Sequence, residues 1–184
     1  ELNLSCPNVR HNLEPAGCKL VAQDKTATEK VVSEVRKKTK LTLITKLSPN
    51  VTDIKEIARA AEGAGTDAIS AVNTLFGLSI DINTKKAKLG NGAGGLSGPA
   101  IKPVALNFVR EIYSAVKIPV IGIGGIMTPS DALEFIICGA TAIQVGTANF
   151  VNPTISLDVL QGIKAYAASK KLKDITSLIG TADI

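Results

Sequence analysis

The sequence predicts an α/β fold in which helices cover a parallel sheet, and three observations support this prediction. Short apolar segments alternate with longer amphipathic ones, which is the pattern of repeated strand–helix units. The 184 residues are 45% hydrophobic and 20% charged, a balance typical of a folded domain rather than of a disordered chain. No linker or internal repeat interrupts the pattern, so we expect one domain spanning residues 1–184.

Five strand–helix units follow one another along the chain. We expect strands at about 1–5, 41–46, 67–72, 119–123 and 141–146, and helices at about 26–38, 52–64, 101–116, 129–138 and 154–169. Two helix starts are marked by capping residues, Thr52 before the second helix and Thr128 before a proline that opens the fourth. Residues 76–99 break the alternation and predict a hairpin-like excursion followed by a glycine-rich loop.

The repeated strand–helix units are compatible with a (β/α)8 TIM barrel. A complete barrel typically needs ~250 residues, so if the pattern is that of a barrel, a chain of 184 residues holds only a portion of one. The expected fold is a barrel truncated to about five β/α units. Because an open barrel exposes strand edges and core, we expect the chain to be part of a longer protein.

Charge and cysteine content narrow the classes of function. The net charge of +5 is spread over several helices and aromatic residues make up only 3% of the chain, so a nucleic-acid surface is not expected. The three cysteines (Cys6, Cys18 and Cys138) and the single histidine (His11) lack metal-ligand spacing, so no metal site is predicted. The odd cysteine count favours a reducing, cytoplasmic compartment. No apolar run approaches the ~18–20 residues of a membrane span.

The carboxyl end of the first strand carries the most informative polar residues, and barrel active sites lie at such strand ends. Alternation along the strand places Asn3 and Ser5 on one face, and Cys6 begins the loop that overlooks that face. An intracellular cysteine most commonly serves as a small buried hydrophobe. The amides of Asn3 and Asn8, which can donate to and accept from a planar polar ligand, favour a functional Cys6 instead.

The second and third strands also end in polar side chains. Lys46 ends the second strand, and a lysine facing into a strand end is commonly paired with an anion, such as a cofactor phosphate or a reduced ring. A lysine that extends to solvent is the alternative at this position. Asn73 and Thr74 end the third strand with an amide and a hydroxyl.

Glycines end the last two strands. Gly124 and Gly125 follow the fourth strand, and Gly146 with Thr147 follows the fifth. Glycines let backbone N–H groups approach an anion, and many barrels bind phosphate in the loops after their last two strands. Two such strand ends in consecutive units therefore predict a phosphate site. The glycines between 90 and 95 lack the spacing of a nucleotide-binding loop and predict a flexible loop.

Together these segments resemble a known family, the dihydroorotate dehydrogenases. The resemblance covers the whole chain and is carried by Asn-Leu-Ser-Cys-Pro-Asn at 3–8, Lys-Leu-Ser-Pro-Asn at 46–50, Asn-Thr at 73–74, Gly-Gly-Leu-Ser-Gly-Pro-Ala-Ile-Lys-Pro at 94–103, Gly-Gly-Ile at 124–126 and Gly-Thr at 146–147. It is strongest to the class 1 enzymes, particularly the type that passes electrons to NAD through a second subunit carrying FAD and a 2Fe–2S cluster. Class 2 enzymes use a serine as base, so Cys6 favours class 1.

The resemblance implies oxidation of (S)-dihydroorotate to orotate in pyrimidine biosynthesis, with FMN as the cofactor. Cys6 is implied as the base that takes the C5 proton while a hydride leaves C6 for FMN. The implied substrate contacts are Asn3, Asn73 and Thr74. The implied FMN contacts are Asn3, Lys46, Val72, Gly98, Gly124, Gly125, Gly146 and Thr147. A homo-oligomer, with the electron-transfer subunit as a further partner, is also implied. The resemblance further implies that the five β/α units are the last five of the barrel and that the N-terminal strands are missing.

The sequence departs from the family pattern in two places, and two alternatives stay open. The loop from Val9 to Gln23 differs from the family's glycine-rich form and is longer, and three N-terminal barrel strands are absent. A dihydropyrimidine dehydrogenase has a similar flavin barrel with a cysteine, although residues 75–89 and the Gly-Thr at 146–147 are more like the dihydroorotate enzymes. The other alternative is a non-catalytic fragment that binds no flavin.

Overall fold

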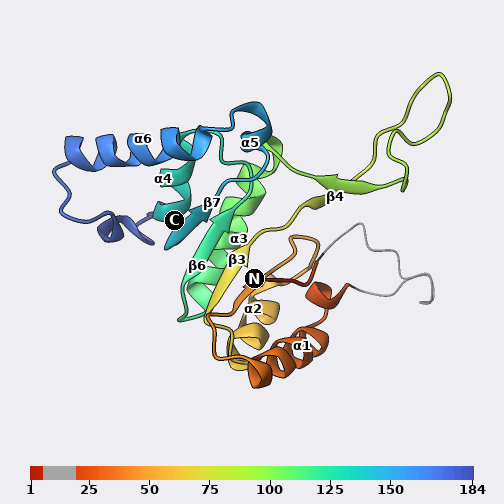
Figure 1. The fold of residues 1–184 in the computed structure, drawn as a ribbon, viewed down its shortest axis with the longest axis horizontal. Helices are drawn as coiled ribbons and strands as arrows, with labels where there is room; N and C mark the ends of the chain where they lie inside the picture. The colour runs from red at the N-terminus through yellow and green to blue at the C-terminus, as the bar shows by residue number, and fades with distance from the viewer. Residues whose placement is uncertain (6–19) are drawn as a thin grey trace.

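A computed structural model describes residues 1–5 and 20–184 of the chain. At its centre, five parallel strands form one sheet in the order β1-β2-β3-β6-β7 (Figure 1). The strands are β1 (Leu2–Asn3), β2 (Ile44–Lys46), β3 (Ala68–Ala71), β6 (Val120–Ile123) and β7 (Ala142–Gln144). Each lies inside a range predicted from the sequence, which confirms the α/β fold with a parallel sheet.

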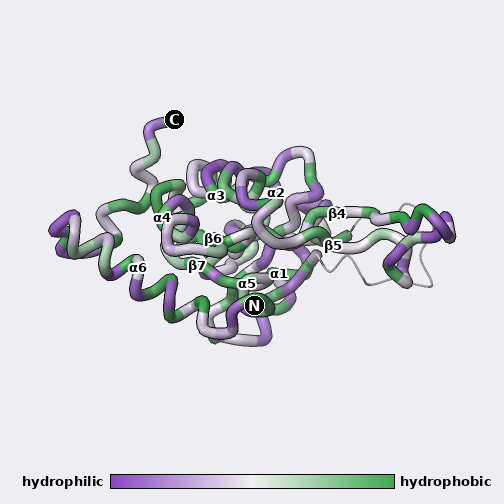
Figure 2. Tube along the Cα trace, turned by 90° about the horizontal axis from the view of Figure 1, so that it is seen from above, coloured by the Kyte–Doolittle hydropathy of each residue, from purple (hydrophilic) through white to green (hydrophobic). Residues whose placement is uncertain are grey.

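Helices cover the outer side of this sheet. They are α1 (Lys25–Lys38), α2 (Ile54–Gly63), α3 (Lys102–Ala115), α4 (Pro129–Cys138), the short α5 (Ala148–Val151) and α6 (Ile155–Ser169), with 3-10 turns η1 (Val21–Gln23), η2 (Pro99–Ile101) and η3 (Ile175–Leu178). α1 packs on α2, α2 on α3, α3 on α4 and α4 on α6, and Figure 2 shows α2 and α3 along one side of β6 and β7, above them in that view. Across residues 1–5 and 20–184, β1 and β7 are the sheet's two edges and no strand closes it into a barrel.

Short polar side chains define the helix starts. Thr128 caps α4 by accepting from the Asp131 N–H at 3.2 Å, as the sequence predicts. The cap predicted at Thr52 is wrong by one residue, and α2 begins at Ile54. Asp53 is the cap of α2, because its carboxylate accepts from the N–H groups of Lys55 at 2.9 Å and Glu56 at 3.3 Å.

The core lies between the sheet and the helices, and a glycine permits its closest contact. Phe135 of α4 is fully buried against β6. A Cβ on Gly122 would lie 2.5 Å from the Phe135 ring, so only glycine lets the ring reach the strand. Leu47, Ile69 and Val109 fill the same core from the sheet side and from α3.

Residues 75–96 leave the sheet as a hairpin. β4 (Leu75–Gly77) pairs antiparallel with β5 (Gly94–Leu96), and Figure 1 shows this arm extending away from the body. The predicted hairpin-like excursion is therefore confirmed. The prediction of a loop throughout 90–95 is wrong at its end, because Gly94 and Gly95 pair with Gly77 and Phe76 as part of β5.

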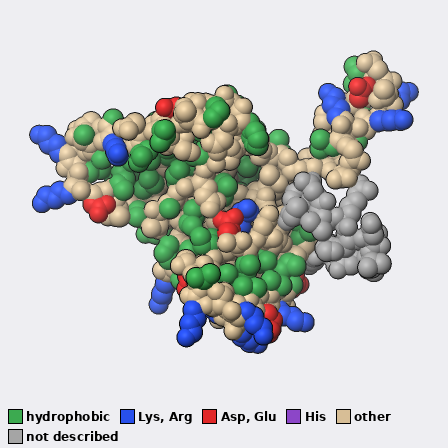
Figure 3. Space-filling view, viewed as in Figure 1, with side chains coloured by type: hydrophobic (Ala, Val, Ile, Leu, Met, Phe, Trp, Pro, Cys, Tyr) green, Lys and Arg blue, Asp and Glu red, His purple; other side chains and the backbone are tan. Residues whose placement is uncertain are grey.

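Hydrophobic and basic side chains gather on different parts of the surface. Figure 3 shows a broad hydrophobic area between α6 and the sheet, whereas basic side chains cluster at the tip of the arm, at the end of α6 and along α1. The positive charge is thus divided among separate ends of the molecule. In the part of the chain that the structure describes, no helix has both the length and the apolar character needed to cross a bilayer.

Candidate active site

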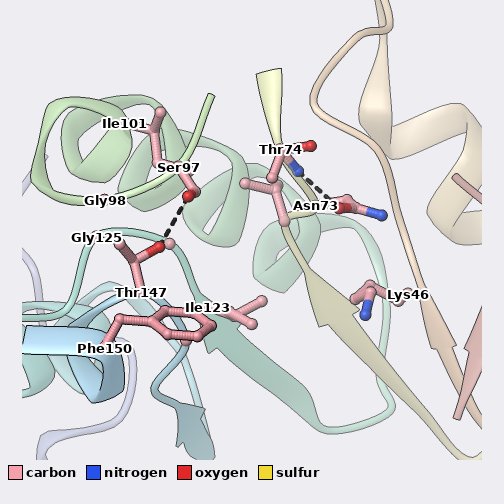
Figure 4. A pocket seen from close by; sticks show the side chains of 13 residues that line it. Lys46, Asn73, Thr74, Ser97, Gly98, Ile101, Ile123, Gly125, Thr147 and Phe150 are labelled. Atoms are coloured by element: carbon pink, nitrogen blue, oxygen red, sulfur yellow. Dashed lines mark hydrogen bonds between the residues drawn. The ribbon is translucent and has the colours of Figure 1, made fainter. Parts of the chain in front are cut away.

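A pocket of about 230 Å³ opens at the carboxyl ends of the parallel strands (Figure 4). Because parallel strands point the same way, the residues that follow β2, β3, β6 and β7 meet at this edge of the sheet. The loop before α3 closes the opposite wall. The lining residues are Lys46, Val72, Asn73, Thr74, Ser97, Gly98, Ile101, Ile123, Gly124, Gly125, Gly146, Thr147 and Phe150.

Nine of the residues predicted from the sequence line this pocket. They are Lys46, Val72, Asn73, Thr74, Gly98, Gly124, Gly125, Gly146 and Thr147. Asn3 does not line the pocket but contacts a residue that does, because its Oδ1 accepts a hydrogen bond from Asn73 Nδ2 at 3.0 Å. Cys6, the predicted base, lies outside the described residues.

Glycines form one wall and bring backbone close to the pocket. Gly98 and Gly125 have φ values of 92° and 78°, which only glycine adopts readily. A Cβ on Gly125 would lie 2.8 Å from the Gly98 oxygen, so the two loops can touch only without side chains. A Cβ on Gly146 would meet nothing within 4 Å, so backbone there faces open space. Such a cradle fits an anionic group such as a phosphate.

A hydrogen bond fixes the two loops that frame the glycine wall. Thr147 Oγ1 donates to Ser97 Oγ at 2.8 Å, and Figure 4 shows the bond spanning from the α5 side to the loop before η2. Thr147 follows β7, whereas Ser97 follows the hairpin arm. The bond therefore connects segments that are 50 residues apart in the sequence.

Amide and hydroxyl groups form the opposite wall, beside β1. Asn73 Nδ2 lies 2.8 Å from Ser5 Oγ and 3.0 Å from both Ser5 O and Asn3 Oδ1, so the β1 end sets the direction of the Asn73 side chain. Asn73 Oδ1 in turn accepts from the Thr74 N–H at 2.8 Å. The amide is thus held by its neighbours in one orientation at the pocket wall.

The Thr74 hydroxyl is buried and has no hydrogen-bond partner among the described residues. A buried hydroxyl without a partner costs free energy, so such a group commonly has a ligand or water for its partner. Gly95 of β5 allows this placement, since a Cβ there would collide with Thr74 Oγ1. Thr74, a residue of the pocket lining, therefore carries a buried hydroxyl whose donor and acceptor are unused among the described residues.

Lys46 brings positive charge to the pocket and is itself paired. Its Nζ lies 3.0 Å from Glu1 Oε1, and the two side chains are 18% and 26% exposed. Burial raises the pKa of Glu1, but hydrogen bonds from Gln144, Lys46 and Ser70 outweigh this effect and lower the pKa below its usual value. Glu1 is therefore an anion at neutral pH. The sequence interpretation missed Glu1.

Four further lining residues were not predicted as site residues. They are Ser97, Ile101, Ile123 and Phe150. Ser97 and Ile101 lie inside the segment 94–103 that carries part of the family resemblance, so their position beside Gly98 could have indicated them as pocket residues. Phe150 is 91% exposed and lies in the short helix α5, which no periodic pattern predicts.

Cys138 has the character of a structural cysteine. It ends α4 and packs against the core. Burial raises the pKa of its thiol, Arg110 partly offsets this, and the net shift is upward. The thiol is therefore protonated at neutral pH. Within residues 1–5 and 20–184, no three His, Cys, Asp or Glu side chains are grouped so that they could hold a metal ion.

Comparison with known proteins gives consistent matches. The family model described as dihydroorotate dehydrogenase matches residues 1–166. The catalytic subunit of dihydroorotate dehydrogenase B (NAD(+)) from Desulforamulus reducens is 52% identical over all 184 residues. The proteins of the same name from Trichlorobacter lovleyi and Lachnoclostridium phytofermentans are 52% identical over 183 residues and 48% identical over 180. The chain spans 59%, 59% and 58% of the lengths of these three relatives.

Proposed function

This chain belongs to the dihydroorotate dehydrogenase family, and on that premise we propose that its pocket is the flavin side of a site that oxidises (S)-dihydroorotate to orotate in pyrimidine biosynthesis. One observation carries the proposal. The cation, the amide, the free hydroxyl and the glycine wall line a single pocket at the carboxyl edge of the sheet. These are the groups that a flavin phosphate, its ring and a polar planar substrate require.

FMN is the proposed cofactor, since membership in this family implies a flavin and the pocket fits a terminal phosphate. Gly98, Gly125 and Gly146 line the pocket, and a Cβ on Gly146 would meet nothing within 4 Å, so the backbone at Gly146 is open to an anion. Lys46 lies at the other side of the same pocket, where a ring that gains negative charge would need a cation. When bound, FMN supplies the acceptor for the hydride that leaves C6 of dihydroorotate.

The substrate would be held by Asn73 and Thr74. The Asn73 amide is already oriented by Asn3 and Ser5, so its direction is set before a ligand binds. The Thr74 hydroxyl, which lacks a partner in the described chain, can donate to a substrate oxygen or accept from a ring N–H. Such preorganised polar groups give specificity and lower the entropic cost of binding.

Cys6 is the proposed base. Its thiolate would take the proton from C5 of dihydroorotate, and the electrons of that C–H bond would form the C5=C6 double bond as the hydride leaves C6. The thiolate form is required because a thiol cannot accept this proton. Asn3 and Ser5 precede Cys6 in the sequence and both contact Asn73, so residues 3–5 lie at the proposed substrate wall.

A second subunit is the proposed route for electrons out of the site. The relatives are named as the catalytic subunit of an NAD(+) enzyme, and that wording describes one member of a complex. We propose that this chain also works with an electron-transfer subunit carrying FAD and a 2Fe–2S cluster, as a homo-oligomer in the cytoplasm. NAD+ would be the final acceptor.

Steady-state assays with two substrates test this function. Protein reconstituted with FMN should oxidise dihydroorotate with an artificial electron acceptor and should not reduce uracil. Uracil reduction without dihydroorotate oxidation would instead identify a dihydropyrimidine dehydrogenase. Protein that stays colourless after incubation with FMN would contradict the proposal and indicate a fragment without a flavin.

A further inference from the structure

The carboxylate of Glu1 joins three strands of the sheet in addition to its own segment. Its Oε1 accepts from Lys46 of β2 at 3.0 Å. Its Oε2 accepts from Ser70 Oγ of β3 at 2.9 Å and from Gln144 Nε2 of β7 at 3.0 Å. Ser70 is fully buried, so one anchor of this carboxylate lies in the interior of the sheet.

Register explains why these groups meet. Asn3 pairs with Lys46, and Lys46 pairs with Ser70, so neighbouring strands bring their polar side chains to one level. Glu1 shares a face with Asn3, because side chains two residues apart along an extended chain point the same way. The polar face that begins with Glu1 thus continues through Asn3 to the pocket wall.

We propose that Glu1 is a positioning residue that fixes the Lys46 ammonium at the pocket wall, where it favours the reduced flavin over the oxidised flavin. This inference rests on the proposed function, because it requires a flavin in the pocket. Glu1 is not among the residues that line the pocket, so it acts through Lys46.

The position of the Lys46 ammonium depends on how freely its side chain moves. A free lysine side chain samples many rotamers, and part of that entropy is lost when a ligand fixes it. A carboxylate with three donors on it is itself fixed, and it sets the position of Lys46 before a ligand arrives. An ammonium group has three N–H donors, and the bond to Glu1 uses one, so the others can serve a ligand.

Glu1→Asp tests this proposal because it keeps the charge and changes only the reach of the side chain. The shorter carboxylate cannot keep all three partners, so Lys46 should move or become mobile. We expect reduced FMN to lose about tenfold in affinity relative to oxidised FMN, which lowers the potential of the bound two-electron couple by ~30 mV. Lys46→Met should lower it at least as far, and adding Glu1→Asp to Lys46→Met should change nothing further.

The matched control is Glu56→Asp. Glu56 makes an ion pair with Lys25 at 2.6 Å, but both side chains are more than half exposed and lie on helices. The control should leave the flavin potential unchanged. An unchanged or raised potential in Glu1→Asp would overturn the proposal, because Glu1 would then not favour the reduced flavin. An equal shift in the Lys46→Met background would also overturn it, because Glu1 would then act independently of Lys46.

A measurement without flavin separates this inference from the proposed function. In protein with 15N-labelled lysines, the Lys46 ammonium signal is identified by its loss in Lys46→Met. We expect it to be rigid in the parent protein and mobile in Glu1→Asp, while the thermal unfolding temperature shows that the variant is folded. Equal rigidity in both proteins would overturn the inference. A parent protein that binds no FMN but keeps a rigid Lys46 would overturn the proposed function, and with it the effect on the flavin, while the positioning of Lys46 by Glu1 would stand.

Discussion

Gly146 is the residue at which the glycine wall can be changed with the least effect on folding. A Cβ there would meet nothing within 4 Å, and its backbone does not adopt the left-handed conformation that disfavours other residues. Gly146 also lines the pocket. A side chain at this position would therefore fill space that a ligand needs without displacing protein atoms.

Gly146→Leu should accordingly weaken FMN binding at least tenfold, or by ~1.4 kcal/mol, because its side chain would occupy the position proposed for the phosphate. Equilibrium titration of FMN fluorescence measures this. Gly63→Leu is the matched control, since Gly63 ends α2, also has open space around it and lies away from the pocket. Equal FMN affinity in both variants would contradict a phosphate site at Gly146.

At the scale of elements, Lys102 joins the starts of α3 and α4. Its Nζ lies 2.6 Å from Asp131 Oδ1 and 2.9 Å from Glu134 Oε1. Lys102 also lies directly against Gly125 of the glycine wall. A Cβ on Gly125 would lie 2.9 Å from the backbone nitrogen of Lys102, so a larger residue does not fit there. The ion pairs therefore hold together the two helices whose preceding loops form the pocket.

These ion pairs make stability depend on pH. Burial raises the pKa of Asp131, but hydrogen bonds from Lys102, the Met127 N–H and Thr128 outweigh it and lower the pKa. A carboxyl with a lowered pKa in the folded state contributes stability above its unfolded pKa of ~3.9, and this is lost as the pH falls through the folded value. Hydrogen bonds to Asp131 and Glu134 raise the pKa of Lys102, so its contribution is lost only in strongly alkaline solution.

Lys102→Met should therefore lower the unfolding temperature at pH 7 by ~2–4 °C, corresponding to ~1 kcal/mol. The difference from the parent should shrink as the pH falls below ~3.9 towards the lowered pKa of folded Asp131, because protonation removes the charge that pairs with Lys102. Calorimetry between pH 3 and pH 7 measures both effects. Lys25→Met, which removes an exposed ion pair, is the control and should change little. A deficit that is independent of pH would contradict this account of Asp131.

The elements also explain which site residues could be predicted from the sequence. Lys46, Asn73 and the glycines that follow β6 and β7 end neighbouring strands of the parallel sheet, which keeps its strands in chain order with only the β4–β5 arm inserted, so the sheet brings these residues together. Ser97 and Phe150 lie on connecting segments, whose path depends on tertiary packing. The sequence gives no indication of the role of Glu1, because its partners lie on β2, β3 and β7. Only the folded sheet brings them within hydrogen-bond distance.

At the scale of the whole molecule, the described sheet is open between β1 and β7, and one side-chain bond spans that opening. Gln144 of β7 donates to Glu1 before β1, so the two edges approach each other through their polar side chains. Strand order and helix coverage followed from the alternation of apolar and amphipathic segments. The absence of closure in the described chain agrees with the length of 184 residues, which is below the ~250 residues of a complete barrel.

The proposed function requires that a base and a flavin act together at one site. Anaerobic rapid mixing of the FMN-loaded protein with dihydroorotate measures this directly through the loss of flavin absorbance. The parent protein should bleach within its turnover time, and Cys6→Ala should keep FMN but react ~10²–10⁴-fold more slowly, as expected when a general base is lost. Bleaching at the same rate in both proteins, or no bleaching of the parent, would contradict the account.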